Sequence, residues 1–190
     1  MKLAFTKMHG CGNNYIYFNC FDQTVPDPES LSIKLSEPHF GIGGDGIILI
    51  SPSDKADAQM RIFNADGSEG KMCGNGIRCV GKYLYDNGMT DGRTTIPIDT
   101  LSGVKTLELT VKDGKMQSAR VDMGAAILAP REIPVDMDGE NVISAPIVVD
   151  EKVYHITCVS MGNPHCVIFQ KEDVDDLDLT RIGPKFEHHP

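Results

Sequence analysis

The sequence has no tryptophan, no C-x-x-C pair, and no apolar run near the roughly 18 residues that a membrane-spanning helix needs. Its N-terminus also lacks the apolar core and cleavage site of a signal peptide, so we expect a cytoplasmic protein with no membrane partner. Basic residues are scarce: 18 Lys and Arg stand against 27 Asp and Glu, a net charge of −9. This balance argues against a nucleic-acid partner and leaves a polar small molecule as the expected ligand.

Six cysteines are present, and in a reducing cytoplasm they are expected to be free thiols. Their spacing does not match a zinc site, so we predict no metal. A free cysteine is most often a small buried apolar residue, and this interpretation holds for most of the six. They are Cys11, Cys20, Cys73, Cys79, Cys158 and Cys166.

Glycine is abundant, with 19 residues, so turns and close backbone approaches should be common. The segment 27–37 predicts a helix with Asp27 as N-cap and Pro28 at its first position. The segment 74–88 predicts a second helix, which Asn87 and Gly88 end. Apolar and β-branched runs predict strands at 2–7, 15–19, 47–50, 60–63, 94–99, 105–111 and 117–122, the last two joined by a hairpin turn.

The chain starts a second set of elements beyond residue 119. Strands are predicted at 142–149, 153–159 and 166–169, and an acidic stretch leads into a short helix near the end. We therefore expect an N-terminal lobe over 1–118 and a second lobe over 119–190. A faint repeat relates the two at an offset of 150, because Gly12-Asn13 and Gly162-Asn163 each precede an apolar run.

The stretch "GIGGDG" (41–46) spells a dinucleotide-binding motif, but that motif needs a strand before it and a helix after it. Here a helix comes before it and a strand after it. We interpret the stretch as a tight glycine loop that lets the backbone approach a neighbour closely.

The stretch "NADGSEGKMCGNGIRC" (64–79) is more informative, because it places Cys73 between a turn and a helix start. The first turn of a helix has unpaired N–H groups and partial positive charge, so a thiol there loses its proton more readily. The N–H groups of Gly74 and Asn75 could hold a carboxylate. A buried structural cysteine after a glycine-rich turn remains the alternative interpretation.

Three segments, "KMHGCGNNYIYF", "NADGSEGKMCGNGIRC" and "MGNPHCVIF", resemble the diaminopimelate epimerase family in order and spacing. The resemblance implies an α/β (α+β) fold of two pseudo-symmetric lobes, each a barrel-like sheet around a central helix. It also implies a cofactor-independent isomerase of lysine and peptidoglycan precursor synthesis. Such an epimerase interconverts LL- and meso-diaminopimelate, with one thiolate removing the α-proton and a second thiol delivering a proton to the opposite face. We expect an amino-acid substrate and a homodimer.

The resemblance assigns a role to individual residues of this sequence. Cys73 matches the first catalytic cysteine, and His165 a histidine near the reacting centre. The remaining matches are to substrate-binding groups, whereas His9 and Cys11 receive no role. Gly46 stands where some members have a substrate-contacting glutamine. The substrate-binding matches are Asn13, Asn64, Gly74, Asn75 and Asn163.

The family's second cysteine and its glutamate-arginine pair have no counterpart in the 190 residues, so the second lobe is expected to be incomplete and the chain alone inactive. Two alternatives stay open. One is another cofactor-independent racemase, acting on histidine or proline; the other is an inactive amino-acid-binding fragment. No lysine motif points to an electron-sink cofactor, and we predict none.

Overall fold

The structure is a computed structural model that describes residues 2–190 and divides into two compact units. The first unit extends to Met123, and the second spans Gly124–Pro190. The boundary expected from the sequence, near residue 119, falls inside strand β8 (Lys115–Val121). Because β8 pairs with the preceding strand along most of its length, it belongs to the first unit.

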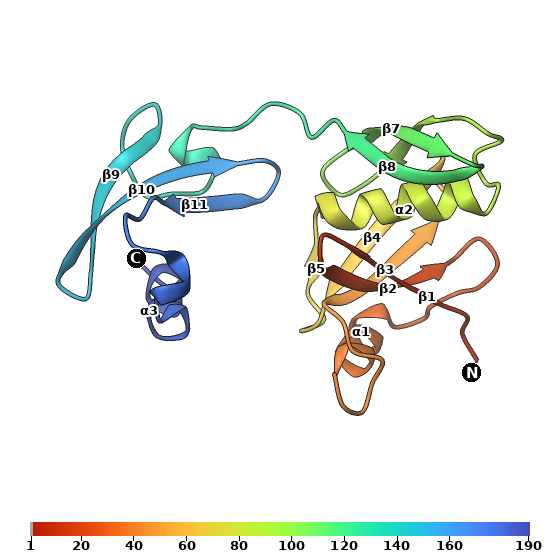
Figure 1. Cartoon of the computed structure of the whole chain (residues 1–190), viewed down its shortest axis with the longest axis horizontal. Coiled ribbons are helices and arrows are strands. Elements are labelled where there is room, and N and C mark those ends of the chain that lie inside the picture. The colour runs from red at the N-terminus through yellow and green to blue at the C-terminus, as the bar shows by residue number, and fades with distance from the viewer. Residues whose placement is uncertain (1) are drawn as a thin grey trace. The chain divides into compact units, whose positions relative to one another are not determined.

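One curled sheet and two helices form the first unit (Figure 1). The strands lie in the order β1-β2-β3-β4-β6-β7-β8, and the short β5 pairs with β4. Their bounds are β1 Thr6–Gly10, β2 Asn13–Asn19, β3 Gly46–Ser51, β4 Ala58–Asn64, β5 Glu69–Gly70, β6 Thr95–Asp99 and β7 Lys105–Lys112. The helices are α1 (Pro28–Ser36) and α2 (Gly74–Asp86).

Helix α2 lies inside the curl of the sheet, where it contacts β1 and β2 at one end of the strand order and β7 and β8 at the other. Its buried residues Ile77, Val80 and Leu84 recur at three and four positions, as an apolar stripe facing one core should. Helix α1 covers the opposite face of the sheet and contacts β3 and β4. The sheet is therefore buried on both faces at its centre.

Strand β2 shows this double burial in its sequence. Tyr15 and Tyr17 belong to the core around α2, whereas Ile16 and Phe18 belong to the core beneath α1. Successive side chains of a strand point to opposite faces, so a strand covered on both sides reads as a continuous apolar run. This is why "YIYF" shows no alternation of polar and apolar residues.

The predicted element boundaries agree with the observed ones to within two residues, apart from the first strand. Asp27 caps α1, with its side chain accepting from the Ser30 N–H at 3.2 Å, as predicted. The first strand was predicted over 2–7 but runs from Thr6 to Gly10. Cys11 and Gly12, both with positive φ, form a tight turn that pairs Gly10 with Asn13. This turn sets the position of β1 in the sequence. The two-residue β5 was not predicted.

The second unit is a three-stranded antiparallel sheet with one longer helix. Its order is β11-β10-β9, formed by β9 (Val142–Val149), β10 (Lys152–Ser160) and β11 (Pro164–Ile168). Helix α3 (Leu179–Glu187) packs Phe186 edge-on against Tyr154, with ring centroids 4.9 Å apart. Two short 3-10 helices, η1 (Pro130–Glu132) and η2 (Val174–Asp176), complete the unit.

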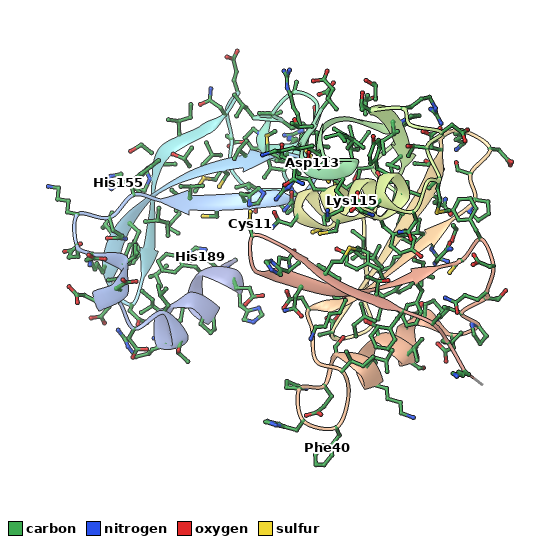
Figure 2. All side chains as sticks on the ribbon, turned by 45° about the vertical axis from the view of Figure 1, so that its right-hand side comes forward. Cys11, Phe40, Asp113, Lys115, His155 and His189 are labelled. Carbon is green, nitrogen blue, oxygen red and sulfur yellow. The ribbon has the colours of Figure 1, made fainter. Side chains whose placement is uncertain are left out.

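The two Gly-Asn pairs behind the faint repeat occupy similar places, each within its own unit. Gly12 and Asn13 lie in the turn between β1 and β2 and at the start of β2, and Figure 2 shows the neighbouring Cys11 at the tip of this hairpin. Gly162 and Asn163 form the turn between β10 and β11. Both glycines have positive φ, of +88° and +100°, which explains why glycine occupies both positions.

Among the residues that the structure describes, no helix combines the length and the apolarity needed to cross a bilayer.

We predict that Gly46→Ala strongly destabilises the protein. Gly46 has a φ of +149°, and a Cβ there would lie 2.1 Å from the carbonyl oxygen of Phe63. The clash involves backbone atoms at the end of the β3–β4 pair, where no flexible side chain can move aside, so we expect the free energy of unfolding to fall by about 3 kcal/mol in urea denaturation.

Gly92→Ala is the matched control, because Gly92 also has a positive φ, +76°, but has no atom within 4 Å of its Cβ position. Its cost should be limited to backbone strain of about 1 kcal/mol. Equal unfolding midpoints for the two variants would contradict the steric argument.

Candidate active site

Cys73 is the N-cap of helix α2, as the sequence predicted. Its backbone is extended, with φ −139° and ψ 110°, and its Sγ accepts a hydrogen bond from the Gly76 N–H at 3.2 Å. The thiol thus takes the place that a serine or aspartate oxygen usually takes at a helix start. It is partly exposed, so a small molecule can reach the sulfur.

The amides of Gly74 and Asn75 follow the thiol directly in the first turn of α2. Amides of a first helical turn have no acceptor within the helix and suit a carboxylate. The side chain of Asn75 is held elsewhere, since its Oδ1 accepts from Arg78 Nη2, while Arg78 Nη1 donates to the Gly74 carbonyl at 2.8 Å. The Oδ1 of Asn75 is therefore engaged within α2, while its backbone N–H lies in the first turn of the helix.

Asn13, at the start of β2, lies against the thiol although 60 residues separate them in sequence. The Cys73 thiol donates to Asn13 Oδ1 at 3.2 Å. The Nδ2 of Asn13 donates to Asp45 Oδ2 at 2.7 Å. Asp45 was not among the residues predicted from the sequence; it lies inside the "GIGGDG" loop, and its place in that loop was the only signal.

Tyr15 is a second residue that sequence reasoning missed. It lies two positions after Asn13 on β2, so both side chains are on the same face of the strand. Burial, with the nearby Cys73 sulfur as the next cause, raises the pKa of Tyr15 to about 12, and its hydroxyl also interacts with Asn13. The phenol therefore stays neutral beside the thiol at physiological pH.

Asn64 ends β4 and pairs in register with Gly46, the residue after Asp45. Its Nδ2 donates to Ser68 Oγ at 3.0 Å, and its carbonyl oxygen accepts from Ser32 Oγ at 2.7 Å. The backbone of Asn64 is thus fixed by its neighbours. A side chain at position 46, such as the glutamine that the family resemblance would allow, does not fit this backbone, because a Cβ would clash with the Phe63 carbonyl oxygen.

The predicted residues Asn163 and His165 lie in the second unit. Asn163 is exposed in the turn before β11, and its carbonyl oxygen accepts from the Met161 N–H at 3.1 Å. His165 is exposed on β11, opposite Val159, and its neighbour Cys166 lies opposite Cys158. Their assigned roles stay predictions, as do those of the first unit's residues.

A cavity of about 620 Å³ within the second unit contains none of the predicted site residues. Its lining includes Cys158, Cys166 and Phe186. Burial, with Cys166 as the next cause, raises the pKa of Cys158 to about 11. Within residues 2–190, no three His, Cys, Asp or Glu side chains gather where they could hold a metal ion.

The fold of this chain is similar to that of two solved structures, a probable proline racemase and a hydroxyproline epimerase. A probable proline racemase from Agrobacterium radiobacter K84 superposes with a TM-score of 0.68 at 16% identity, covering 96% of this chain and 53% of that chain. A hydroxyproline epimerase from Agrobacterium vitis gives 0.65 at 16% identity, with 94% and 52% covered. The predicted α/β architecture is therefore confirmed, and the chain corresponds to about half of those two structures.

Sequence comparison defines the family. A family model described as diaminopimelate epimerase matches residues 5–129. Diaminopimelate epimerase of Acetivibrio thermocellus is 56% identical over 188 residues, which cover 99% of this chain and 66% of the relative. That of Agathobacter rectalis is 53% identical over 194 residues, covering 98% and 67%. The chain belongs to the diaminopimelate epimerase family, whose members are isomerases of lysine biosynthesis, and spans about two thirds of the length of these relatives.

We predict that Cys73 is alkylated at least about tenfold faster than Cys79 or Cys158 at pH 8. The thiolate is the reactive form, and the Cys73 sulfur is partly exposed at a helix start, where iodoacetamide can reach it. Burial raises the pKa of the Cys79 thiol, and Cys158 is shifted to about 11, so both buried thiols stay protonated at this pH. Peptide mapping after timed exposure to iodoacetamide gives the three rates, and equal rates for Cys73 and Cys79 would contradict the argument.

Proposed function

We propose that this chain carries the first half-site of a cofactor-independent epimerase that interconverts LL- and meso-diaminopimelate. One observation supports this proposal above all: the Cys73 thiol is the N-cap of α2, beside the first-turn amides of Gly74 and Asn75. That arrangement joins a proton-transferring group to an anion-binding group within one turn of helix. The 56% identity to a diaminopimelate epimerase favours this substrate over histidine or proline.

The proposed reaction begins with the substrate carboxylate bound at the first turn of α2. The amides of Gly74 and Asn75 would hold it and stabilise the charge that develops as the α-proton leaves. The proton passes from the α-carbon to Cys73 Sγ, and the electron pair of the C–H bond stays on the substrate as a carbanion. Exclusion of water around the bound substrate would strengthen these interactions.

Inversion needs a second acid that protonates the opposite face of the α-carbon. The family resemblance assigns this role to a second cysteine outside the 190 residues. Asn13, Asn64, Asn163 and His165 are proposed to hold the polar groups of the substrate or to lie near its reacting centre. We place the reaction in the cytoplasm, where thiols stay reduced, and a homodimer stays a prediction.

The proposal predicts different outcomes for this chain alone and for a completed protein. The completed protein is a chimera that appends the remaining third of the Acetivibrio thermocellus relative to this chain. In D₂O with LL-diaminopimelate, the chimera should form the meso isomer at about 1 per second or faster and incorporate α-deuterium. The 190-residue chain alone should form no meso isomer at a useful rate.

Cys73→Ala in the chimera is the control, and it should abolish both inversion and deuterium incorporation. Inversion by the 190-residue chain alone at the rate of the chimera would contradict the need for a second thiol outside it. An inactive chimera that folds, as judged by circular dichroism and thermal unfolding, would argue against diaminopimelate as the substrate.

We predict that Asn64→Ala in the chimera lowers kcat/KM by about 30-fold or more, which corresponds to ~2 kcal/mol of transition-state stabilisation. Its cost in stability should be only about 1 kcal/mol, because the side chain makes one hydrogen bond, to Ser68 Oγ. Steady-state kinetics and urea denaturation give the two numbers.

Ser68→Ala separates the two roles, because it removes the partner of Asn64 and leaves the amide in place. It also removes the bond from the Ser68 hydroxyl to Asp66 Oδ1 at 2.6 Å, so it should cost somewhat more stability than Asn64→Ala but much less activity. If both variants lower kcat/KM to the same extent, Asn64 acts through the turn rather than on the substrate.

A further inference from the structure

Asp45 is the one acidic side chain that the structure connects by hydrogen bonds to the candidate thiol. Its Oδ2 accepts from Asn13 Nδ2 and from the Asn14 N–H, each at 2.7 Å. Its own N–H donates to the Asn14 carbonyl at 2.7 Å. Asp45 is therefore bound to two consecutive residues at the start of β2 through three hydrogen bonds.

The glycine loop "GIGGDG" is built to hold Asp45 at this place. The N–H groups of Gly41, Ile42, Gly43 and Gly44 donate to carbonyl groups at the C-terminal end of α1, at 2.8–3.2 Å. A Cβ at Gly41 would lie 2.6 Å from the Leu35 carbonyl oxygen, so only glycine allows this approach. On the other side of Asp45, Gly46 enters β3. The loop thus bridges a helix end and a strand start, with Asp45 at the junction.

The bond to Asp45 decides which end of the Asn13 amide faces the sulfur. Because Nδ2 donates to the carboxylate, Oδ1 is left to face Cys73, where it lies 3.2 Å from Sγ. If the amide were reversed, its oxygen would stand 2.7 Å from the carboxylate oxygen, with two acceptors and no proton between them. The reversed amide is therefore excluded as long as Asp45 is present.

We propose that Asp45 is a positioning residue that locks Asn13 as the acceptor of the Cys73 S–H. An amide oxygen can bond a thiol but not a thiolate, whereas an amide N–H would bond a thiolate. The bond to Asn13 therefore stabilises the form of Cys73 that has already taken up a proton, whereas the Gly76 N–H can donate to the sulfur in either form. In the proposed reaction this favours transfer of the substrate α-proton to sulfur, and this consequence rests on the proposed function.

Other titratable groups also lie around the thiol. Tyr15 and Tyr17 face it from β2, and Cys79 lies near it on α2. Burial raises the pKa of Tyr15 to about 12 and also raises those of Tyr17 and Cys79, so all three stay neutral near pH 7. Arg78, on the same helix, is bonded to Gly74 and Asn75. Asp45 is the group that acts on Cys73 through a side-chain bond to Asn13.

The test is the pH dependence of Cys73 alkylation by iodoacetamide in the 190-residue chain, read by peptide mapping. Asp45→Ala frees the Asn13 amide to turn its Nδ2 toward the sulfur. Because Nδ2 would then bond the thiolate, the pH of half-maximal alkylation should fall by about 0.5–1 unit, the shift that the free energy of one hydrogen bond produces. Asp45→Asn keeps an oxygen acceptor for Asn13 without the charge, and its profile should match that of the unmodified chain.

The Asn13→Ala background shows whether Asp45 acts through the amide. The double variant Asn13→Ala, Asp45→Ala should have the same pH of half-maximal Cys73 alkylation as the single variant Asn13→Ala. A further fall of the midpoint in that background, or an Asp45→Asn profile that matches Asp45→Ala, would overturn the proposal in favour of a direct effect of the charge. An Asp45→Ala midpoint equal to that of the unmodified chain would overturn it as well.

Slow alkylation of the buried Cys79 reports that each variant is folded. If Asp45→Ala does not fold, nuclear Overhauser effects in the unmodified chain decide the question. The Nδ2 protons of Asn13 should be close to the Asn14 amide proton, because both groups donate to one oxygen. Contacts to the Cys73 Hβ protons instead would overturn the proposal. These measurements need no turnover, so an inactive chimera would remove the proposed function and leave the role of Asp45 standing.

Discussion

The burial of α2 inside the curled sheet is the constraint on which the candidate site depends. The helix can lie there because its small residues allow close contact: a Cβ at Gly76 would stand 2.6 Å from Ile48 Cδ1, and one at Gly81 would stand 2.7 Å from Leu107 Cδ2. A helix held this tightly presents its first turn at a fixed place. The amides of that turn and the Cys73 sulfur are therefore positioned by the core rather than by a mobile loop.

The strand ends around α2 supply the rest of the site. Asn13 begins β2, Asp45 precedes β3 and Asn64 ends β4, and these three strands are neighbours in the sheet. Because β2 and β3 are parallel, their starts meet at one edge, and the antiparallel β4 ends at the same edge. Three polar residues from distant parts of the sequence thus lie at the same ends of three neighbouring strands, and one of them, Asn13, contacts the Cys73 thiol at the start of α2.

Local features of the fold could be predicted from the sequence, and long-range ones could not. The caps at Asp27 and Cys73 and the end of α2 at Asn87 and Gly88 follow from residues within one or two turns of each other. The contact between Asp45 and Asn13 spans 32 residues, and no local pattern marks it. The register of β1 depends on its partner strand and turn, which is why the predicted strand began too early.

The same distinction applies to the candidate site. Cys73 and its two amides form one short segment, so the helix-start signal in the sequence was sufficient to single them out. Tyr15 was hidden in an apolar run whose double burial the sequence did not reveal, and Asp45 in a loop interpreted only as a close backbone approach. The glycines of the loop 41–46 hold Asp45 in place. That role could be recognised only once the hydrogen-bond partners of Asp45, Asn13 and Asn14, were known.

A crystal structure of the Cys73→Ala chimera with diaminopimelate bound would test the central claim most directly, because the variant cannot turn the substrate over. We expect a substrate carboxylate oxygen within about 3.2 Å of the amide nitrogens of Gly74 and Asn75. The α-carbon should face the space left by the missing sulfur. A carboxylate bound away from the first turn of α2 would rule out Cys73 and its neighbouring amides as the first half-site.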